Sequence, residues 1–268
     1  MDSKLNSETL QRIQAALESA STILGGFNPG DIETEYKKGH DPVTEADRLV
    51  DAALRRELLR DDEGWLSEET ADDLSRLDRS RVWIVDPLDG TREFVKGIPE
   101  FCISIAMVES GQPVAGGICN PATRETFIGS LQTGVTYNGV LAHASQRAKL
   151  DGALVLASRS EVKRGEWEAF KEAPFKVQPM GSVAYKLARV AAGLADATFT
   201  LTPKNEWDVA AGAALVISAG GSVQTLENTG LRCNNKNPLL SGLIATGPHL
   251  REKMLSLLKE YPQSTLRQ

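Results

Sequence analysis

Two carboxylates, Asp86 and Asp89, come directly after a short apolar run at residues 82–85. β-Branched and aromatic residues in such a run are typical of a strand that is buried on both faces. An ionised carboxylate beside a buried strand is costly unless positive charge meets it, and no lysine or arginine lies between Asp86 and Thr91. The stretch fits a tight turn, because Pro and Asp-Gly are turn residues. It also fits a divalent-cation site with two hard oxygen ligands.

Further acids stand at the ends of predicted elements. Asp47 lies three residues after Thr44, a spacing typical of a capping box at a helix start. Glu68 ends a short predicted strand, and Asp208 lies in the first turn of a predicted helix, where the helix dipole favours a carboxylate. Each acid can therefore be explained singly as a cap, a dipole partner or a solvated loop residue. Their joint order and spacing are not easily explained in that way.

The composition bounds the class of protein. A chain of 268 residues forms one large domain or two ordinary ones. The net charge of -6 argues against a broad nucleic-acid surface, but it allows a phosphorylated substrate, because bound metal can reverse the local sign. Three scattered cysteines without a CxxC pair support neither a zinc knuckle nor a disulfide framework. No apolar run reaches the length of a membrane span, so the cytoplasm is the predicted compartment and no membrane partner is expected.

The elements that must position these acids change character along the chain. Two helices are predicted before residue 60, and consecutive strands without intervening helices then predict an antiparallel sheet. A short loop is predicted at residues 92–97. After residue 152 strands alternate with helices, including one at residues 162–172, which is typical of an α/β layer. We therefore predict an N-terminal α+β subdomain at residues 1–147, with most metal ligands, and a C-terminal α/β subdomain at residues 148–268, which supplies Asp208 and substrate-selecting residues.

Several motifs in this order resemble the inositol monophosphatase superfamily of magnesium-dependent, lithium-sensitive phosphatases. The resemblance covers roughly residues 6–250 and implies a layered αβαβα sandwich of two subdomains, in a family whose members are often homodimers. The matching segments are DPVTEAD (41–47), SEE (67–69), WIVDPLDGT (83–91), GSVAYKLARVAAGLADA (181–197) and WDVAAG (207–212).

The resemblance also implies roles for individual residues. Glu68, Asp86 and the backbone carbonyl of Leu88 would hold one Mg²⁺. Asp86 would bridge to a second ion shared with Asp89 and Asp208, and Glu68 would help to hold a third, so that each site takes two or three ions. Mg²⁺ prefers oxygen ligands, and two ions can stabilise both the attacking water and the leaving alkoxide. Clustered carboxylates repel one another, so the empty site should be unstable until cations enter.

The catalytic and phosphate-binding residues come from the same resemblance. Asp47 and Thr91 would orient or deprotonate the attacking water, and Glu68 is counted with them as catalytic. The backbone amides of Gly90 and Thr91 would contact phosphate oxygens.

The predicted substrate depends on short segments that differ between groups of enzymes within this superfamily. GTREF (90–94) and SRS (158–160) resemble bacterial 3′(2′),5′-bisphosphate nucleotidases, whereas KGIPEF (96–101) is closer to the inositol enzymes. Inositol enzymes usually place an acid seven residues before the metal-binding Asp208, and that position is Leu201 here. We predict hydrolysis of the 3′-phosphate of adenosine 3′,5′-bisphosphate, giving AMP and phosphate, with the other phosphate contacted by Ser182, Lys186 and Lys204.

Other substrates and another class of protein stay open. Inositol 1-phosphate or histidinol phosphate would suit the same scaffold. A non-catalytic metal-binding protein is the alternative outside enzymes, and it predicts a damaged metal set. Every expected acid is present, which favours an enzyme.

Overall fold

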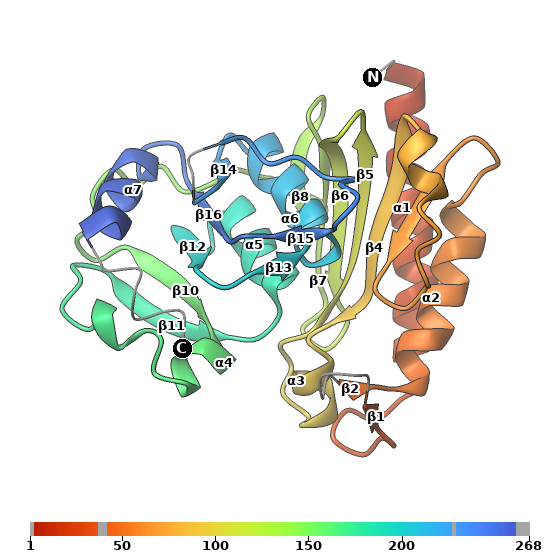
Figure 1. The fold of residues 1–268 in the computed structure, drawn as a ribbon, viewed down its shortest axis with the longest axis horizontal. Coiled ribbons are helices and arrows are strands. Elements are labelled where there is room, and N and C mark those ends of the chain that lie inside the picture. Colours follow the sequence, from red (N-terminus) through yellow and green to blue (C-terminus); the bar gives the residue numbers. More distant parts are fainter. Residues whose placement is uncertain (1–2, 37–41, 227–228, 261–268) are drawn as a thin grey trace.

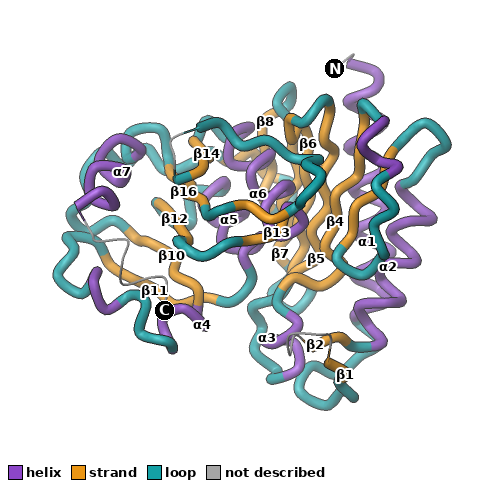
Figure 2. Tube along the Cα trace, in the orientation of Figure 1, coloured by secondary structure: helices purple, strands orange, loops and turns teal. Residues whose placement is uncertain are grey.

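The chain folds into five alternating layers of helices and sheets in a computed structural model that describes residues 3–36, 42–226 and 229–260 (Figure 1). Helices α1 (Ser3–Leu24) and α2 (Glu45–Leu58) cover one face of a seven-stranded sheet. Helices α5 (Val183–Ala191) and α6 (Glu206–Ser218) lie between that sheet and a five-stranded one (Figure 2). Helix α7 (Arg251–Glu260) packs on the far face. The predicted αβαβα sandwich is confirmed.

The first sheet is built around its second strand, β4. Val82 and Ile84 of β4 pack into the core on the α6 side, whereas Trp83 and Val85 pack against α1 and α2, and all four are at most 1% exposed. The predicted strand buried on both faces is therefore confirmed. Strand β3 pairs parallel to β4, and every later pair is antiparallel. In spatial order the strands are β3 (Gly64–Ser67), β4 (Arg81–Asp89), β5 (Cys102–Glu109), β6 (Gln112–Asn120), β7 (Glu125–Ser130), β8 (Gly134–Tyr137) and β9 (Val140–Ala142).

The second sheet is mixed. Strand β10 pairs parallel to both of its neighbours, and β16 pairs antiparallel to both of its own. Its spatial order is β11 (Lys176–Met180), β10 (Leu154–Ser158), β12 (Ala197–Thr200), β16 (Leu243–Thr246) and β14 (Ser222–Thr225). Two short antiparallel pairs complete the strands: β1 (Glu35–Tyr36) with β2 (Pro42–Val43), and β13 (Lys204–Asn205) with β15 (Leu239–Leu240).

Two local predictions are wrong. The loop predicted at residues 92–97 begins as a short helix, α3 (Thr91–Val95), because Gly90 before it adopts φ 99°, a conformation that glycine tolerates and other residues rarely adopt. The helix predicted at residues 162–172 is divided into α4 (Arg159–Lys163) and a 3₁₀ turn at Glu168–Phe170. Gly165 between them has φ 82°, which ends the first helix.

Helix α6 gives the two sheets a common core. Its residues from Val209 to Val216 are buried on every side, which is typical of a helix in the interior of a protein. The same hydrophobic cluster contains Ile84 of the first sheet and Leu156 of the second. The predicted division between residues 147 and 148 falls between β9 and β10 and stays a prediction. None of the helices in the described ranges is long and apolar enough to cross a bilayer.

Candidate active site

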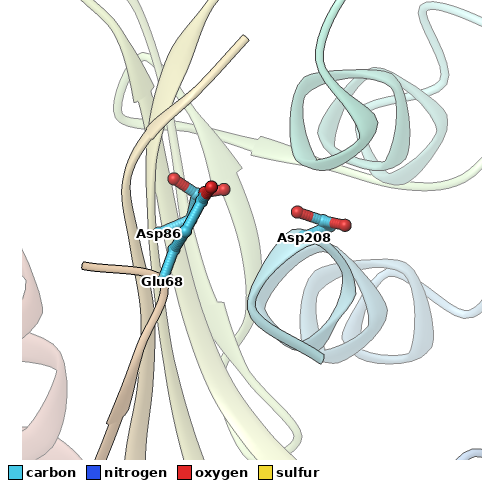
Figure 3. Close-up of side chains that lie close together, drawn as sticks. All are labelled: Glu68, Asp86 and Asp208. Atoms are coloured by element: carbon cyan, nitrogen blue, oxygen red, sulfur yellow. The ribbon is translucent and has the colours of Figure 1, made fainter. Parts of the chain in front are cut away.

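Three acids that are far apart in the sequence meet between the sheets. The register pairs Ser67 of β3 with Val85 of β4, so that the next residues, Glu68 and Asp86, are neighbours at the same sheet edge. Asp208 comes from the first turn of α6 and faces them (Figure 3). One carboxylate oxygen from each of the three lies within 4.8 Å of the others. The sequence motifs placed these three side chains in one site, and the structure brings them together.

Burial and mutual repulsion make the charged forms of Asp86 and Asp208 less favourable. The pKa of Asp86 is raised well above its ordinary value, first by burial and then by the charges of Glu68, Asp89 and Asp208. The pKa of Asp208 is raised in the same way. Asp86 Oδ1 accepts a hydrogen bond from the amide of Leu88 at 3.0 Å, whereas its buried Oδ2 has no hydrogen-bond partner among the described residues.

This donor set fits a divalent cation. A buried carboxylate oxygen without a partner is unfavourable, and a cation would satisfy it and relieve the repulsion between the acids. All three groups offer hard oxygen atoms, the ligands that Mg²⁺ prefers in proteins.

Asp89 lies in the same pocket but stands apart from this cluster. Its Oδ2 accepts hydrogen bonds from Ser182 Oγ at 2.7 Å and from the amide of Ala184 at 2.6 Å, at the start of α5. Ser182 is the N-cap of α5, and its hydroxyl also accepts from the amide of Tyr185. In the described part of the chain, Asp89 is not one of the three acids within 4.8 Å of one another. Its role as a ligand of a second ion stays a prediction.

The two carboxylate oxygens of Asp47 make different contacts. Its Oδ2 accepts from the amide of Thr44 at 2.8 Å and from the Thr44 hydroxyl at 2.6 Å, which confirms the predicted capping box. Its Oδ1 lies 3.1 Å from Thr91 Oγ1, and that hydroxyl lies 2.9 Å from the carbonyl oxygen of Leu88. A hydroxyl has one proton to donate, so Thr91 can serve only one of these acceptors at a time. Asp41, the first residue of the same motif, lies outside the described residues.

A cavity of about 390 Å³ opens over these groups. Gly90 and Thr91 line it beside the acids, and its remaining wall carries cations. Their presence gives the pocket both signs of charge, so that an anion can bind once the acids have been neutralised. A larger groove of about 810 Å³ lies between α1 and strands β6–β8, away from the acid cluster. The cations that line the smaller cavity are Arg92, Arg159, Lys186 and Lys204.

The predicted substrate contacts all lie in this pocket. Lys186 is 4% exposed, and its ammonium donates to the carbonyl oxygen of Ser182 at 2.7 Å. Burial lowers the pKa of Lys186, and the nearby Asp89 charge opposes that change. Lys204 Nζ lies 3.1 Å from a carboxylate oxygen of Glu161, a buried residue of α4. The roles of Ser182, Lys186 and Lys204 in substrate binding stay predictions.

Sequence reasoning missed two residues that support the site. Asp51 of α2 accepts hydrogen bonds from the hydroxyls of Ser67 and Thr70, on either side of Glu68. Its position four residues after Asp47 was an available signal, because residues at that spacing share a helix face.

Glu100 was missed as well. It binds the guanidinium of Arg159, with 2.6 Å between Nη2 and Oε1, and accepts from the amide of Gly181 at 2.7 Å. These three residues come from distant parts of the sequence, so no local pattern could have joined them.

Comparison with known proteins identifies the class of this site. The sequence profile of the inositol monophosphatase family matches residues 5–263. The protein is a phosphatase, and its chain belongs to the inositol monophosphatase family. Enzymes of this family use Mg²⁺, which agrees with the carboxylate cluster.

Individual relatives agree over nearly their whole lengths. The chain is 33% identical to inositol monophosphatase 2 of Solanum lycopersicum, with 92% of this chain and 96% of the relative covered. Among solved structures, the extragenic suppressor protein suhB from Bartonella henselae superposes with a TM-score of 0.79 at 30% identity, covering 94% of this chain and 98% of that one. CysQ from Bacteroides thetaiotaomicron superposes with a TM-score of 0.75 at 27% identity, covering 90% and 97%.

Proposed function

We propose that this protein is a Mg²⁺-dependent phosphomonoesterase that hydrolyses the 3′-phosphate of adenosine 3′,5′-bisphosphate, giving AMP and phosphate. Two or three ions would be held by Glu68, Asp86, the carbonyl of Leu88, Asp89 and Asp208. The observation that carries the proposal is the pocket itself, in which clustered acids face a wall that bears Lys186 and Lys204.

The chain's own groups suit attack by water on a phosphate monoester. Bound Mg²⁺ supplies positive charge that makes water more acidic and attracts phosphate oxygens. The Thr91 hydroxyl, held between Asp47 Oδ1 and the carbonyl of Leu88, is placed to accept a hydrogen bond from water and to donate to Asp47. Asp47 can then receive the proton that the water loses, because general bases act over such hydrogen-bond distances.

The substrate class follows from what lines the rest of the pocket. Leu201, which stands where inositol enzymes usually have an acid, packs against the apolar cluster of the second sheet. It does not belong to the pocket lining, whereas Lys186 and Lys204 do. A pocket wall that bears two lysines and lacks that acid favours a second phosphate over a neutral ring hydroxyl. Ammonium groups bind phosphate oxygens by charge-assisted hydrogen bonds.

A second candidate substrate is an inositol monophosphate such as inositol 1-phosphate, and this class is favoured by the name of the Solanum lycopersicum relative, inositol monophosphatase 2. A panel assay separates the two. Phosphate release is measured from adenosine 3′,5′-bisphosphate, inositol 1-phosphate and histidinol phosphate, each with Mg²⁺ and with EDTA. We expect the highest kcat/KM on the bisphosphate. A much higher kcat/KM on inositol 1-phosphate would replace the nucleotide assignment, and release that is unaffected by EDTA would reject the metal-dependent reaction.

Replacement of Lys186 tests the second-phosphate contact. Lys186→Met keeps the length of the side chain and removes a buried charge, so the fold should be retained. We expect KM for adenosine 3′,5′-bisphosphate to rise about 10- to 100-fold, since a hydrogen bond to a charged group contributes roughly 1.5–3 kcal/mol. KM for adenosine 3′-monophosphate, which lacks the 5′-phosphate, should change little.

The matched control is Lys163→Met, which removes an exposed lysine of the same subdomain. It should leave both constants unchanged. An equal rise in KM for the two substrates in Lys186→Met would show that this lysine does not select the second phosphate.

Metal binding should also stabilise the fold in a pH-dependent way. Asp86 and Asp208 have pKa values raised above the ordinary 3.8, so the folded, metal-free protein holds their protons more tightly than the unfolded chain. The free energy of unfolding without metal should therefore fall as pH rises from about 3.8 through these raised values. Mg²⁺ must displace the protons, so its stabilising effect should grow over the same range.

Thermal unfolding across a pH series, with Mg²⁺ or with EDTA, measures this effect. Mg²⁺ at about 100 times its Kd should add roughly 2.7 kcal/mol at neutral pH and much less near pH 4. A melting temperature that does not respond to Mg²⁺ at neutral pH would contradict the proposed site.

We propose the cytoplasm as the compartment of this enzyme. Cys102, Cys119 and Cys233 are all buried free thiols. Unpaired thiols suit a reducing compartment, and a small phosphorylated metabolite is the partner that the pocket would meet there.

A further inference from the structure

A buried arginine ties the segment that follows Glu68 to a distant loop. Arg76 lies in a 3₁₀ turn, Ser75–Asp78, and is 1% exposed. Its guanidinium donates to Asp72 Oδ2 at 2.8 Å, to Asn234 Oδ1 at 2.6 Å and to the carbonyl oxygen of Asn235 at 2.9 Å. The side-chain amide of Asn234 donates back to the carbonyl of Arg76 at 3.2 Å. One guanidinium thus fixes both the segment after Glu68 and the Asn234–Asn235 pair.

The same pair of asparagines is held on its other side by the helix that carries Asp208. Glu206 is the first residue of α6 and is 0% exposed. Its carboxylate accepts from the amides of Asn234 at 2.6 Å and Asn235 at 2.9 Å, and from the side-chain amide of Asn235 at 2.7 Å. Its own amide donates to the carbonyl of Pro238 at 2.8 Å. Glu206, which lies two positions before Asp208, therefore fastens the start of α6 to residues 234–238.

Together these contacts form one bridge between two segments that carry acids of the cluster. A buried cation and a buried anion each bind the Asn234–Asn235 pair, so most hydrogen bonds in the bridge involve a charged group. Charge-assisted hydrogen bonds are shorter and stronger than neutral ones, no buried side-chain atom of these four residues is left without a partner among the described residues, and such a network fixes geometry. Neither Arg76 nor Glu206 lines the active-site pocket, so neither is placed to touch a substrate.

The two segments that the bridge connects carry acids that repel one another. Glu68 and Asp208 come from opposite sides of the site (Figure 3) and each brings a carboxylate oxygen within 4.8 Å of the other, a distance at which two like charges repel. Without a cation, repulsion favours a wider spacing between the Glu68 segment and the start of α6. A rigid connection between the two segments opposes that widening.

We propose that Arg76 and Glu206 are positioning residues, whose bridge through Asn234 and Asn235 keeps Glu68 and Asp208 at the spacing at which they share a cation. The inference rests on the proposed Mg²⁺ site. Outer contacts that orient metal ligands typically contribute 10- to 100-fold in metal affinity. Loosening the bridge should therefore weaken metal binding and leave turnover at saturating metal nearly intact.

The test uses the full chain with Arg76→Met and Glu206→Gln. Glu206→Gln keeps the size of the side chain but removes its charge and turns an amide donor toward one of the donors of Asn234 and Asn235. The Kd for Mn²⁺ is measured by electron paramagnetic resonance without substrate. The Mg²⁺ concentration for half-maximal hydrolysis of p-nitrophenyl phosphate is measured separately. We expect both values to rise about 10- to 100-fold, with kcat at saturating Mg²⁺ within about threefold of wild type.

Arg76→Lys is the conservative variant. It keeps the buried charge and should recover part of the Mn²⁺ affinity. It also serves as the second variant if Arg76→Met does not fold, and a Kd for Mn²⁺ equal to that of wild type in both Arg76→Lys and Glu206→Gln would overturn the proposal.

Asp196→Asn is the matched control for loss of stability. Asp196 is a buried carboxylate just before β12 that accepts from the amide of Leu154 at 2.7 Å, and it does not line the active-site pocket. It should lower the melting temperature without changing the Kd for Mn²⁺. If Arg76→Met and Glu206→Gln behave like this control, the bridge has a structural role only. If wild-type protein binds no Mn²⁺, the metal site itself is wrong and the bridge proposal is overturned with it.

Discussion

Asp86→Asn is expected to lower phosphomonoesterase kcat by about 10³-fold or more, because loss of several kcal/mol of charge stabilisation corresponds to that factor. Asp86 shares the cluster with Glu68 and Asp208, and its buried Oδ2 has no hydrogen-bond partner among the described residues. An amide in its place keeps the volume and weakens the ligand for a cation. Initial rates of phosphate release over a wide range of Mg²⁺ concentrations measure the loss.

The same substitution should stabilise the protein when metal is absent. Burial and neighbouring acids raise the pKa of Asp86, so its charge is unfavourable in the folded state at neutral pH. Asp86→Asn removes that charge. Urea unfolding in EDTA should therefore show a higher free energy of unfolding than for wild type. Asp61→Asn, which replaces an exposed acid in a surface turn, is the control and should change neither quantity. Wild-type turnover in Asp86→Asn would contradict the assigned site.

Thr91→Val is expected to lower kcat by about 10²- to 10⁴-fold, the usual contribution of a positioned proton acceptor and its relay. Valine keeps the shape of threonine but removes the hydroxyl that lies between Asp47 Oδ1 and the carbonyl of Leu88. Asp47→Asn should have an effect of similar size. The double variant should be little worse than the more damaged single variant, because residues that act as a unit are strongly non-additive. Single-turnover rates at saturating Mg²⁺ measure these losses.

The control for this pair separates catalysis from helix capping. Asp47 also accepts from Thr44 at the start of α2, so part of the effect of Asp47→Asn will be on stability. Thr44→Ala removes only the cap hydroxyl and should cost about 1 kcal/mol of unfolding free energy with kcat close to wild type. A Thr91→Val enzyme with wild-type kcat would show that the hydroxyl takes no part in proton transfer.

The sequence predicted the centre of the fold well because its signals there are local and strong. The β-branched and aromatic run before Asp86 is typical of a strand covered on both faces, and alternate residues of β4 do enter the two core clusters. The helix that carries Asp208 was predicted at residues 205–219, and its observed boundaries, Glu206–Ser218, agree closely with that range. The predicted meeting of Glu68, Asp86 and Asp208 relied on family resemblance, since no local pattern specifies which strand ends are adjacent.

The remaining features depended on contacts that a linear pattern does not contain. The helix predicted at residues 162–172 failed because Gly165 turns the chain and lets Trp167 stack on Phe199, with 4.4 Å between ring centroids. Edge strand β11 contains Pro179, a residue that argues against a strand unless an edge is expected. Glu206 lies at a helix start, where acids are common, and only the folded chain shows its asparagine partners.

Helix α6 has a consequence for synthesis on the ribosome. It fills the space between the sheets, yet it begins at residue 206, whereas the last strand of the first sheet ends at residue 142. A ribosome adds about 5–20 residues per second, so roughly 60 further residues take about 3–12 s. For most of that interval, until α5 is made at residues 183–191, the inner face of the nascent first sheet, including Ile84 and Ile118, has no helix to cover it. The middle of translation, after residue 142 and before both central helices are made, is therefore a stage at which this chain needs protection from aggregation.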